Sequence, residues 1–530
     1  MNRRQRRLTS ATLVIVLAAA LAACVPGGQN GDTVTLPALV PLPASVDTTA
    51  GAPFRFTDET VIDGEKDAAA ALTALLEART GIPGATGDEP GIVLRIERGG
   101  APESYELVAN EASIVVTGAD AAGLFYGVQT LGQLVRPDGG SWIVPAVRIA
   151  DAPRFAYRGV MLDVARHFQT VDTIKAYIDR ASGLKFNALH LHLSDDQSWR
   201  LQLASRPLLT ELSSSSSVGG DPGGFYTKAD YADIVAYASA HHMMVVPEFD
   251  MPGHTHAITL AYPELMEEPV IDDHMRDIAA THGGDLPVNG VDYEGMAVGF
   301  SSLKIHDEAT YDFVADVFGE LAGITPGPYL HFGGDESLAT SDEDFDVFVS
   351  RVSEIISNLG KTPVAWHEAG SAAGLADDTV GQYWGYMTPT DGMDDKARAF
   401  AQVILSPADA IYLDMKPTAA SDLGLTWANG PTSVERSYSW EPADIVPGAS
   451  ILGVEAPMWT ETITNLDDID RMAFPRIASA AEAAWSPATT ESDLRTWDSF
   501  RERVGAMGPL WTSLGIGFAS SDEIPWATSE

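Results

Sequence analysis

Acidic residues follow three successive apolar runs in the middle of the chain. These residues are Asp195 and Asp196, Glu248 and Asp250, and Asp335 and Glu336. Neighbouring carboxyl groups push their pKa values apart, so that one can remain protonated near neutrality while the other is ionised. Such a pair suits the hydrolysis of a glycosidic bond, which needs a proton for the leaving oxygen and electron density behind the anomeric carbon. The spacing alone does not say which carboxyl takes which role.

Aromatic residues accompany carboxyl groups at the ends of the later runs. These ends read Trp366-His367-Glu368, Gln382-Tyr383-Trp384, Tyr412-Leu413-Asp414 and Trp459-Thr460-Glu461. Sugars are bound by this combination, because hydroxyls need bidentate acceptors while the apolar ring faces stack on indoles. Each residue alone has a structural explanation, since a terminal Asp often caps the next helix and a Trp is usually core. The repetition of the pattern favours a sugar site.

Short apolar runs alternate with longer amphipathic stretches beyond residue 151, which is typical of βα units and a parallel sheet. The runs are Val160–Asp163, Ala188–Ser194, Met243–Phe249, Tyr329–Gly333, Pro363–Trp366, Val380–Trp384, Ala401–Leu405 and Ile451–Ala456. Helices are expected between them, such as Val171–Leu184, Lys228–His241, Glu308–Leu321 and Asp342–Leu359. Eight runs favour an α/β fold closed into a (β/α)8 TIM barrel, whose active sites lie at the carboxyl ends of the strands.

An open, doubly wound sheet is the structural alternative to the barrel. Such a sheet usually has fewer strands and often carries a Gly-rich phosphate loop after the first one. The sequence after the first run, Asp163-Val164-Ala165-Arg166, offers no such loop. The barrel is therefore the preferred interpretation.

A small α+β domain is expected at residues 36–150, ahead of a barrel at residues 151–530 that includes a C-terminal helical tail. Its expected elements are a helix at Ala68–Arg79, strands at Ile92–Ile96, Tyr105–Ala109 and Ser113–Thr117, and a helix at Ala119–Val135. Pro145 and Pro153 flank an extended joint, where the pattern changes to that of the barrel.

Residues 1–23 have the pattern of a signal peptide. A basic start precedes an apolar run, Ala11 to Ala23, that is too short to span a bilayer comfortably. The sequence Leu21-Ala22-Ala23-Cys24 resembles a bacterial lipobox, in which Cys24 becomes the lipidated first residue. A cleaved signal with a chance cysteine is the alternative. Residues 24–35 are expected to be a tether, and the protein to lie outside the cytoplasm, anchored to the outer face of the cell membrane through that lipid alone, or secreted.

Composition excludes several classes of protein. The chain has 530 residues, of which 45% are hydrophobic and 20% charged, as in ordinary globular proteins. Its 33 Lys and Arg residues against 74 Asp and Glu residues give a net charge of -41, which repels phosphate backbones, so we expect no nucleic-acid partner. Cys24 is the single cysteine, so neither intramolecular disulfides nor a four-thiolate metal site can form.

The motifs together resemble glycoside hydrolase family 20, the β-N-acetylhexosaminidases. They are Tyr157–Asp163, Leu191–Arg200, Pro247–His254, His331–Glu336 and Gly453–Glu461. The Gly-Gly-Asp-Glu and Asp-Met-Pro-Gly-His blocks in combination are highly specific, and the resemblance covers nearly the whole mature chain. It implies a small α+β domain before a (β/α)8 barrel. It also implies a retaining exo-glycosidase that removes terminal β-linked N-acetylglucosamine or N-acetylgalactosamine from oligosaccharides or glycoconjugates.

The resemblance implies a mechanism in which no enzyme carboxylate attacks the sugar. Glu336 would be the general acid/base, and the substrate's own 2-acetamido oxygen would be the nucleophile, giving an oxazolinium intermediate and net retention. Asp335 would orient the acetamido N–H and stabilise its developing positive charge. Tyr412 would donate to the acetamido carbonyl oxygen. The walls of the acetamido pocket would be Trp366, Trp384 and Trp459.

Other matched positions imply contacts with the sugar hydroxyls. Arg158 matches the arginine that binds O3 and O4, Glu461 the acid that accepts from O4, and Asp414 the O6 contact. Asp195 and His254 resemble a support pair that tunes the general acid, with His254 oriented by the aspartate. Structural roles remain as alternatives: Arg158 could be a barrel-floor ion pair, and His254 could cap the Pro-Gly turn.

A metal-dependent hydrolase that uses His190, His192 and His254 is a rival interpretation. His190 and His192 share a strand face, as ligands could. His-X-His on a barrel strand with no mapped carboxylate bridge is nevertheless a weak signal. We therefore expect neither a metal nor a cofactor.

Two further alternatives keep the pocket but change the function. A lipid-anchored, catalytically inactive glycan-binding protein would have no need for the protonated acid beside an orienting aspartate. A same-family enzyme that releases a disaccharide, a lacto-N-biosidase, would need a roomier pocket near Glu461, and the sequence leaves it open. Ser213–Ser217 and Glu264–Ser302 look like inserted loops over the active-site face, which bear on what is bound beyond the terminal sugar.

Overall fold

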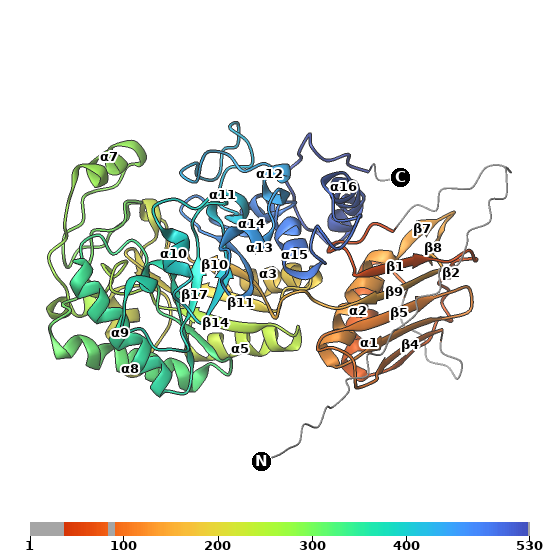
Figure 1. Cartoon of the computed structure of the whole chain (residues 1–530), viewed down its shortest axis with the longest axis horizontal. Coiled ribbons are helices and arrows are strands. Elements are labelled where there is room, and N and C mark those ends of the chain that lie inside the picture. The colour runs from red at the N-terminus through yellow and green to blue at the C-terminus, as the bar shows by residue number, and fades with distance from the viewer. Residues whose placement is uncertain (1–36, 83–90, 528–530) are drawn as a thin grey trace, which may run out of the picture. The chain divides into compact units, whose positions relative to one another are not determined.

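The computed structural model describes residues 37–82 and 91–527 (Figure 1). The predicted signal peptide, the tether and Cys24 lie outside the described residues. Among the helices within these two ranges, none is both long and apolar enough to traverse a lipid bilayer.

A six-stranded mixed sheet forms the first domain. Its strand order is β1 (Ser45–Thr48), β9 (Val147–Asp151), β5 (Tyr105–Ala109), β6 (Ile114–Gly118), β4 (Ile92–Ile96) and β3 (Ile62–Gly64). A smaller sheet contains β2 (Phe54–Arg55), β8 (Ser141–Val144) and β7 (Arg136–Asp138). The helices α1 (Lys66–Thr80) and α2 (Ala121–Leu134) pack their apolar faces on the larger sheet, where Leu72, Leu107 and Tyr126 are buried in one core.

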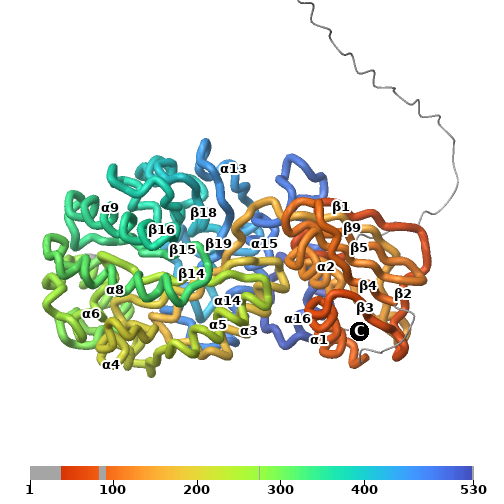
Figure 2. The backbone as a smooth tube through the Cα atoms, turned by 90° about the horizontal axis from the view of Figure 1, so that it is seen from below, coloured from red at the N-terminus to blue at the C-terminus, as the bar shows by residue number. Residues whose placement is uncertain are grey.

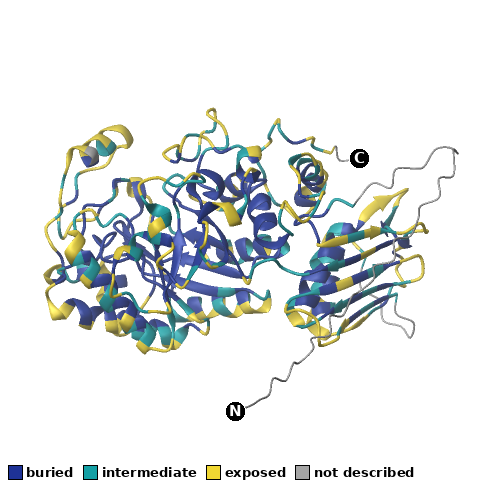
Figure 3. Cartoon of the chain, viewed as in Figure 1, coloured by how far each residue is buried: buried dark blue, intermediate teal, exposed yellow. Residues whose placement is uncertain are grey.

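Eight parallel strands then close into a barrel. In barrel order they are β10 (Tyr157–Asp163), β11 (Ala188–His192), β14 (Met244–Glu248), β15 (Tyr329–His331), β16 (Thr362–Trp366), β17 (Val380–Tyr383), β18 (Gln402–Leu405) and β19 (Ile451–Met458). The strand β10 pairs with β11 on one side and β19 on the other. All its residues are buried, because both faces of the strand are covered (Figure 3). The predicted fold class, a TIM barrel after a small α+β domain, is confirmed.

Polar caps fix where the helices around the barrel begin. The helices are α3 (Val171–Gly183), α5 (Lys228–Ala240), α8 (Glu308–Ile324), α9 (Asp342–Asn358), α14 (Leu466–Ala473), α15 (Ile477–Trp485) and α16 (Trp497–Ser513). The side chains of Thr170, Thr227 and Ser341 each accept a hydrogen bond from a backbone N–H of the first turn. Each cap marks the residue after which its helix begins. The loop between the preceding strand and the helix therefore remains available for site residues.

Short elements fill the connections. They are β12 (Ser194–Asp195), β13 (Ser198–Trp199), α4 (Leu208–Leu212), η1 (Val218–Gly220), α6 (Ile258–Ala261), η2 (Pro263–Leu265), α7 (Asp273–His282), η3 (His367–Ser371), α10 (Met393–Ala397), α11 (Ala408–Ile411), α12 (Val434–Tyr438) and α13 (Pro442–Ile445). Most of them follow a strand's carboxyl end, so the connections at that end of the barrel hold much of the local structure around the site.

A buried polar cluster joins the two domains. The Asp151 carboxylate accepts hydrogen bonds from the Tyr105 hydroxyl at 2.7 Å, and from the Lys185 ammonium and the Trp485 indole, each at 2.9 Å. Trp485 also belongs to the apolar core of the first domain, and α16 contacts α1 (Figure 2). Because the Asp151 and Lys185 charges are paired, their burial leaves no isolated charge at this junction.

Candidate active site

The carboxyl pair Asp335–Glu336 lies in a tight turn directly after β15. Three residues of the turn have left-handed backbone: Gly333 at φ 72°, Gly334 at φ 94° and Glu336 at φ 44°. A Cβ at Gly333 would lie 1.8 Å from Asp250 Oδ1, so only glycine fits there. The same oxygen accepts a hydrogen bond from the Gly334 N–H at 3.0 Å. Asp250, from the loop after β14, thereby fixes the turn that carries both acids.

His254 connects this carboxyl pair to the predicted support residue. Its Nε2 lies 3.4 Å from Glu336 Oε2 and 3.6 Å from Asp335 Oδ2, and its Nδ1 lies 3.2 Å from Asp195 Oδ1. Burial alone would lower the pKa of His254, but the charges of Asp195, Asp335 and Asp250 raise it well above its usual value. The ring is therefore an imidazolium that faces both acids.

Asp335 and Glu336 differ in their surroundings. The Asp335 side chain is buried, whereas that of Glu336 is 35% exposed. Burial, together with the charges of Glu336 and Glu248, raises the pKa of Asp335, and the His254 charge opposes the rise. The exposed carboxyl is thus the one placed to exchange protons with an incoming molecule, and the buried one can contact only what enters the pocket.

Asp195 is held between positively charged groups. Its Oδ2 accepts from the Arg166 guanidinium at 2.7 Å and from His192 Nε2 at 2.8 Å. Burial would raise the pKa of Asp195, but Arg166 and His254 hold it far below its usual value. The adjacent Asp196 instead accepts from the Ser301 hydroxyl, which attaches the predicted inserted loop 264–302 to the site.

Four predicted aromatic residues form one wall. The ring centroids of Trp366 and Trp459 are 6.0 Å apart, and those of Tyr412 and Trp459 are 6.5 Å apart. Trp384 and Tyr412 both contact Trp427, at 5.9 and 5.7 Å between centroids. Trp427, which is 44% exposed, lies at the rim of this wall. Its place in the wall was not predicted, because it lies 22 residues beyond the end of β18.

Hydrogen bonds fix the indoles of Trp366 and Trp384. The Trp366 N–H donates to Glu248 Oε1 at 2.9 Å, and the Trp384 N–H donates to Glu368. Burial and the charge of Asp335 raise the pKa of Glu368 to about 8. Two members of the wall are therefore positioned by polar groups as well as by packing.

Carboxylates with free acceptor atoms complete the site. Both side-chain oxygens of Asp414, Oε2 of Glu461 and Oδ1 of Asp335 are buried and have no hydrogen-bond partner among the described residues. Burial and the charge of Glu461 raise the pKa of Asp414 well above its usual value, and burial raises the pKa of Glu461 to about 7, against the effect of Arg166. Leaving buried acceptors unpaired costs free energy. These carboxylates are therefore suited to a ligand that carries many hydrogen-bond donors.

Arg166 belongs to this group, and the predicted Arg158 does not. The Arg166 guanidinium lies over the Trp459 ring, 4.8 Å from its centroid. Asp163 at the end of β10 accepts from the backbone N–H of Arg166 at 3.1 Å and from that of Thr460 at 3.1 Å. One carboxylate therefore positions both the arginine and the loop that carries Trp459.

The prediction for Arg158 is corrected by its position. It is the second residue of β10, five residues before the strand's carboxyl end, or about 16 Å away at 3.3 Å per residue. Its guanidinium pairs with Glu103 at 2.7 Å, donates to the Lys185 carbonyl and lies over the Trp485 ring. Arg158 thus forms an ion pair with Glu103 at the domain junction. This role resembles the structural alternative given above, an ion pair at the barrel floor.

Three clusters of described side chains have donor atoms close enough together to hold a metal ion. They are His190 with Glu248 and His331, Asp195 with Asp196 and His254, and Asp250 with His254 and Asp335. In each cluster at least one carboxylate lies within 3.6 Å of an imidazole nitrogen, as expected for groups that share protons. These contacts account for the clusters without a metal ion but do not test for one, so the expectation of no metal stays a prediction.

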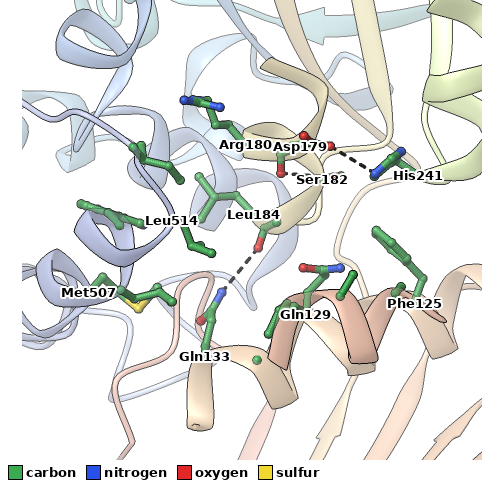
Figure 4. Close-up of a pocket in the computed structure, with 18 of the residues that line it drawn as sticks. Phe125, Gln129, Gln133, Asp179, Arg180, Ser182, Leu184, His241, Met507 and Leu514 are labelled. Atoms are coloured by element: carbon green, nitrogen blue, oxygen red, sulfur yellow. Dashed lines mark hydrogen bonds and ion pairs between the residues drawn. The ribbon is translucent and has the colours of Figure 1, made fainter. Parts of the chain in front are cut away.

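A separate cavity of about 440 Å³ lies where the first domain meets the barrel. Phe125, Gln129 and Gln133 of α2 line one side, and Met507 and Leu514 the other (Figure 4). Its lining residues in the described chain include none of those predicted for the active site. It is therefore distinct from the acidic and aromatic group at the strand ends.

Comparison with known proteins gives matches along most of the chain. Residues 36–152 match glycosyl hydrolase family 20, domain 2, and residues 155–343 and 337–488 match glycosyl hydrolase family 20, catalytic domain. A β-N-acetylhexosaminidase of Cellulomonas fimi is 40% identical over 513 residues, covering 92% of this chain and 97% of its own length.

Solved structures agree with these matches. A glycoside hydrolase family 20 β-N-acetylglucosaminidase superimposes with a TM-score of 0.85 at 67% identity, over 93% of this chain and all of its own. The Streptomyces plicatus N-acetyl-β-hexosaminidase in complex with Thio-NAglucal superimposes with a TM-score of 0.83 at 44% identity, over 93% of this chain and 98% of its own.

Proposed function

Because the chain belongs to glycosyl hydrolase family 20, we propose that this glycoside hydrolase removes one terminal β-linked N-acetylglucosamine or N-acetylgalactosamine and retains the anomeric configuration. The substrates would be oligosaccharides or glycoconjugates that end in such a sugar. The observation that carries the proposal is the buried Asp335 beside an aromatic wall, because a pocket of that kind suits an acetamido group and places an anion next to its N–H.

The substrate's acetamido oxygen is the proposed nucleophile. The charge of Asp335 reaches Tyr412, whose pKa is raised well above its usual value by burial first and then by Asp414 and Asp335. A protonated Tyr412 can donate to the acetamido carbonyl oxygen while Asp335 accepts from the acetamido N–H. The carbonyl oxygen is then held for attack on C1, and the positive charge that develops on nitrogen lies beside Asp335.

Proton transfer by Glu336 completes both steps. In the first step its carboxyl proton goes to the glycosidic oxygen as the C1–O bond breaks and the C1–acetamido bond forms. In the second step its carboxylate takes a proton from water, which attacks C1 and reopens the oxazolinium ring. The exposed position of Glu336 and its contact with His254 support both roles.

The sugar hydroxyls would bind the remaining charged groups. Arg166 and Glu461 lie together near Trp459, which suits O3 and O4, and the unpartnered oxygens of Asp414 suit O6. The short helix η1, directly after the predicted loop Ser213–Ser217, meets the predicted loop 264–302 beside Arg166: the Val218 N–H donates to the Arg166 carbonyl, and the Gly219 N–H donates to the Glu294 carbonyl. These bonds hold both segments next to Arg166, and this proximity supports release of a single sugar over release of a disaccharide.

Two assays test this function. Hydrolysis of an aryl N-acetyl-β-glucosaminide, followed by NMR, should give the β-anomer first, and an N-acetylglucosamine thiazoline should inhibit strongly, because it resembles the cyclised intermediate. The matching aryl β-glucoside, which lacks the acetamido group, should scarcely react. Comparable rates on the two substrates, or initial release of the α-anomer, would reject the mechanism. Release of intact lacto-N-biose from an aryl β-lacto-N-bioside would instead support the disaccharide alternative.

The proposed cellular location rests on the sequence alone. We propose that Cys24 carries a lipid that anchors the protein to the outer face of the cell membrane, because the cysteine directly follows the apolar run of the signal. Cys24→Ser should move the protein from the membrane fraction to the soluble fraction. Unchanged fractionation of this variant would reject lipidation.

A further inference from the structure

We propose that Glu248 is a positioning residue, which sets the orientation and charge environment of Glu336 through a continuous row of buried side chains. The row leads from Glu248 through His192, Asp195 and His254 to Glu336. This inference deepens the proposed function and rests on it. It assigns a role to a carboxylate that points into the barrel and has no free acceptor atom for a sugar.

Both oxygens of Glu248 are engaged by other side chains. Oε1 accepts from the Trp366 indole at 2.9 Å and lies 3.0 Å from His331 Nδ1. Oε2 lies 2.5 Å from His192 Nδ1 and 3.1 Å from His190 Nε2. Glu248 is fully buried, and the imidazole charges hold its pKa well below its usual value against the effect of burial. It is therefore a fixed negative charge.

His192 transmits that charge to the next link. Its Nδ1 faces Glu248, and its Nε2 lies 2.8 Å from Asp195 Oδ2. A ring that donates from both nitrogens must carry both protons. Burial alone would lower the pKa of His192, but Glu248 and Asp195 raise it to about 9. Without the Glu248 charge, that pKa would fall and Asp195 would lose one of its partners.

His254 delivers the effect to the acid. Asp195 fixes the ring through Nδ1, so Nε2 points at Glu336. Other charged groups also face the row. Arg166 contacts both Asp195 and His192 and is itself paired with Asp163, while Asp335 and Asp250 face His254. These groups keep Asp195 ionised when one link is cut. Loss of one link should therefore weaken proton transfer by Glu336 without abolishing it.

Glu248 also couples the two halves of the site. One oxygen holds Trp366, which walls the acetamido pocket, and the other begins the row to the acid on the leaving-group side. Glu455 provides a matched comparison. It is an equally buried carboxylate that accepts from His190 at 2.8 Å, from Gln382 at 2.7 Å and from Tyr157. It contacts neither Trp366 nor His192 in the described structure.

The test compares Glu248→Gln with Glu455→Gln on two aryl N-acetyl-β-glucosaminides, one with a good leaving group and one with a poor one. Only the poor leaving group needs full proton transfer from the acid. Glu248→Gln should lower kcat/KM about 10-fold or more on the poor leaving group beyond its effect on the good one. It should also shift the acidic and basic limbs of the pH profile. Glu455→Gln should change stability without changing that ratio.

A second variant separates the two arms of Glu248. His192→Asn cuts the row but leaves the bond between Glu248 and Trp366, so it should reproduce the leaving-group effect and the pH shift. Equal losses on both substrates with an unshifted pH profile, in either variant, would overturn the proposal. If the wild-type protein does not hydrolyse N-acetylhexosaminides, the proposed function fails instead.

A measurement on the unaltered protein tests the charged links of the row even if neither variant folds. Histidine ¹⁵N NMR should show that the rings of His192 and His254 are still doubly protonated at pH 8, because carboxylates outweigh burial at both, with the pKa of His192 raised to about 9. Loss of the imidazolium signals of His192 and His254 between pH 6 and pH 8 would overturn the row of charged links.

Discussion

His254 Nε2 lies 3.4 Å from Oε2 of Glu336, although the two residues come from different strand-end loops. Both have left-handed backbone, at φ 53° and φ 44°. Such φ values are costly for residues other than glycine and persist only where surrounding contacts impose them. Here Asp195 holds the imidazole and the Gly333–Gly334 turn carries the carboxyl. Both sides of the contact that the proposed proton transfer needs therefore have backbone of this kind.

Replacement of the acid tests this contact directly. Glu336→Gln should lower kcat about 100-fold or more on an aryl N-acetyl-β-glucosaminide with a poor leaving group, because the amide cannot supply the proton. The loss should be smaller with a good leaving group. Steady-state kinetics on both substrates, with the exposed Glu343→Gln as a surface control, measures the effect. Near-normal turnover by Glu336→Gln would contradict its assignment as the acid.

The two arginines of β10 and its loop should separate binding from stability. Arg166→Met should reduce kcat/KM about 10- to 100-fold, the worth of charge-assisted hydrogen bonds to sugar hydroxyls. Arg158→Met should leave kcat/KM close to wild type but lower the free energy of unfolding by about 3 kcal/mol, because Glu103 loses its partner at the domain junction. Urea unfolding and steady-state kinetics on both variants check this. A loss of kcat/KM in Arg158→Met but not in Arg166→Met would show that Arg158 binds the sugar.

The arginine example shows what sequence patterns could and could not predict. Apolar runs predicted every barrel strand, and the acids and indoles after them met at one end because parallel strands share a direction. Arg158 was misplaced because it lies before the apolar run rather than after it, so strand direction alone puts it at the other end of the barrel. Arg166, three residues beyond the strand, satisfied the same rule that identified the acids.

Other parts of the site had no sequence signal. Trp427 contacts Trp384 and Tyr412 from the long connection between β18 and β19, 22 residues after the end of β18. The bonds of Glu248 to His192 and Trp366 depend on which strands become neighbours across the barrel interior. Period and spacing place a residue on its own strand, whereas these contacts depend on the closed barrel.

The turn before the acids should not tolerate a side chain. Gly333→Ala would place a methyl group 1.8 Å from Asp250 Oδ1, so the turn must move and kcat should fall by more than 10-fold. A methyl group at Gly360, which has φ 74°, would meet no heavy atom within 4 Å, so Gly360→Ala isolates the backbone cost, about 1 kcal/mol, without loss of activity. Kinetics and thermal unfolding of both variants decide it. Full activity in Gly333→Ala would show that Asp250 does not fix the turn.

Stability should fall as pH rises, in part because of Glu368. Burial and the charge of Asp335 raise its pKa to about 8, whereas an unfolded Glu titrates near 4.3. Between these values the folded protein binds more protons than the unfolded chain, so the free energy of unfolding decreases with increasing pH. The groups that face Glu368 are Asp335, Glu336, the Trp384 indole N–H and the His367 ring, which burial keeps neutral by lowering its pKa to about 3.

Glu368→Gln removes this proton uptake and keeps an acceptor for the Trp384 indole. Urea unfolding at pH 5 and pH 8 should therefore show a smaller loss of stability for Glu368→Gln than for the wild-type protein. Histidines with raised pKa values also lose stability over part of this range, but they are common to both proteins, so the difference reports Glu368. Glu343→Gln, on the exposed first turn of α9, should keep the wild-type slope. Identical slopes for Glu368→Gln and the wild-type protein would mean that Glu368 is already ionised at pH 5.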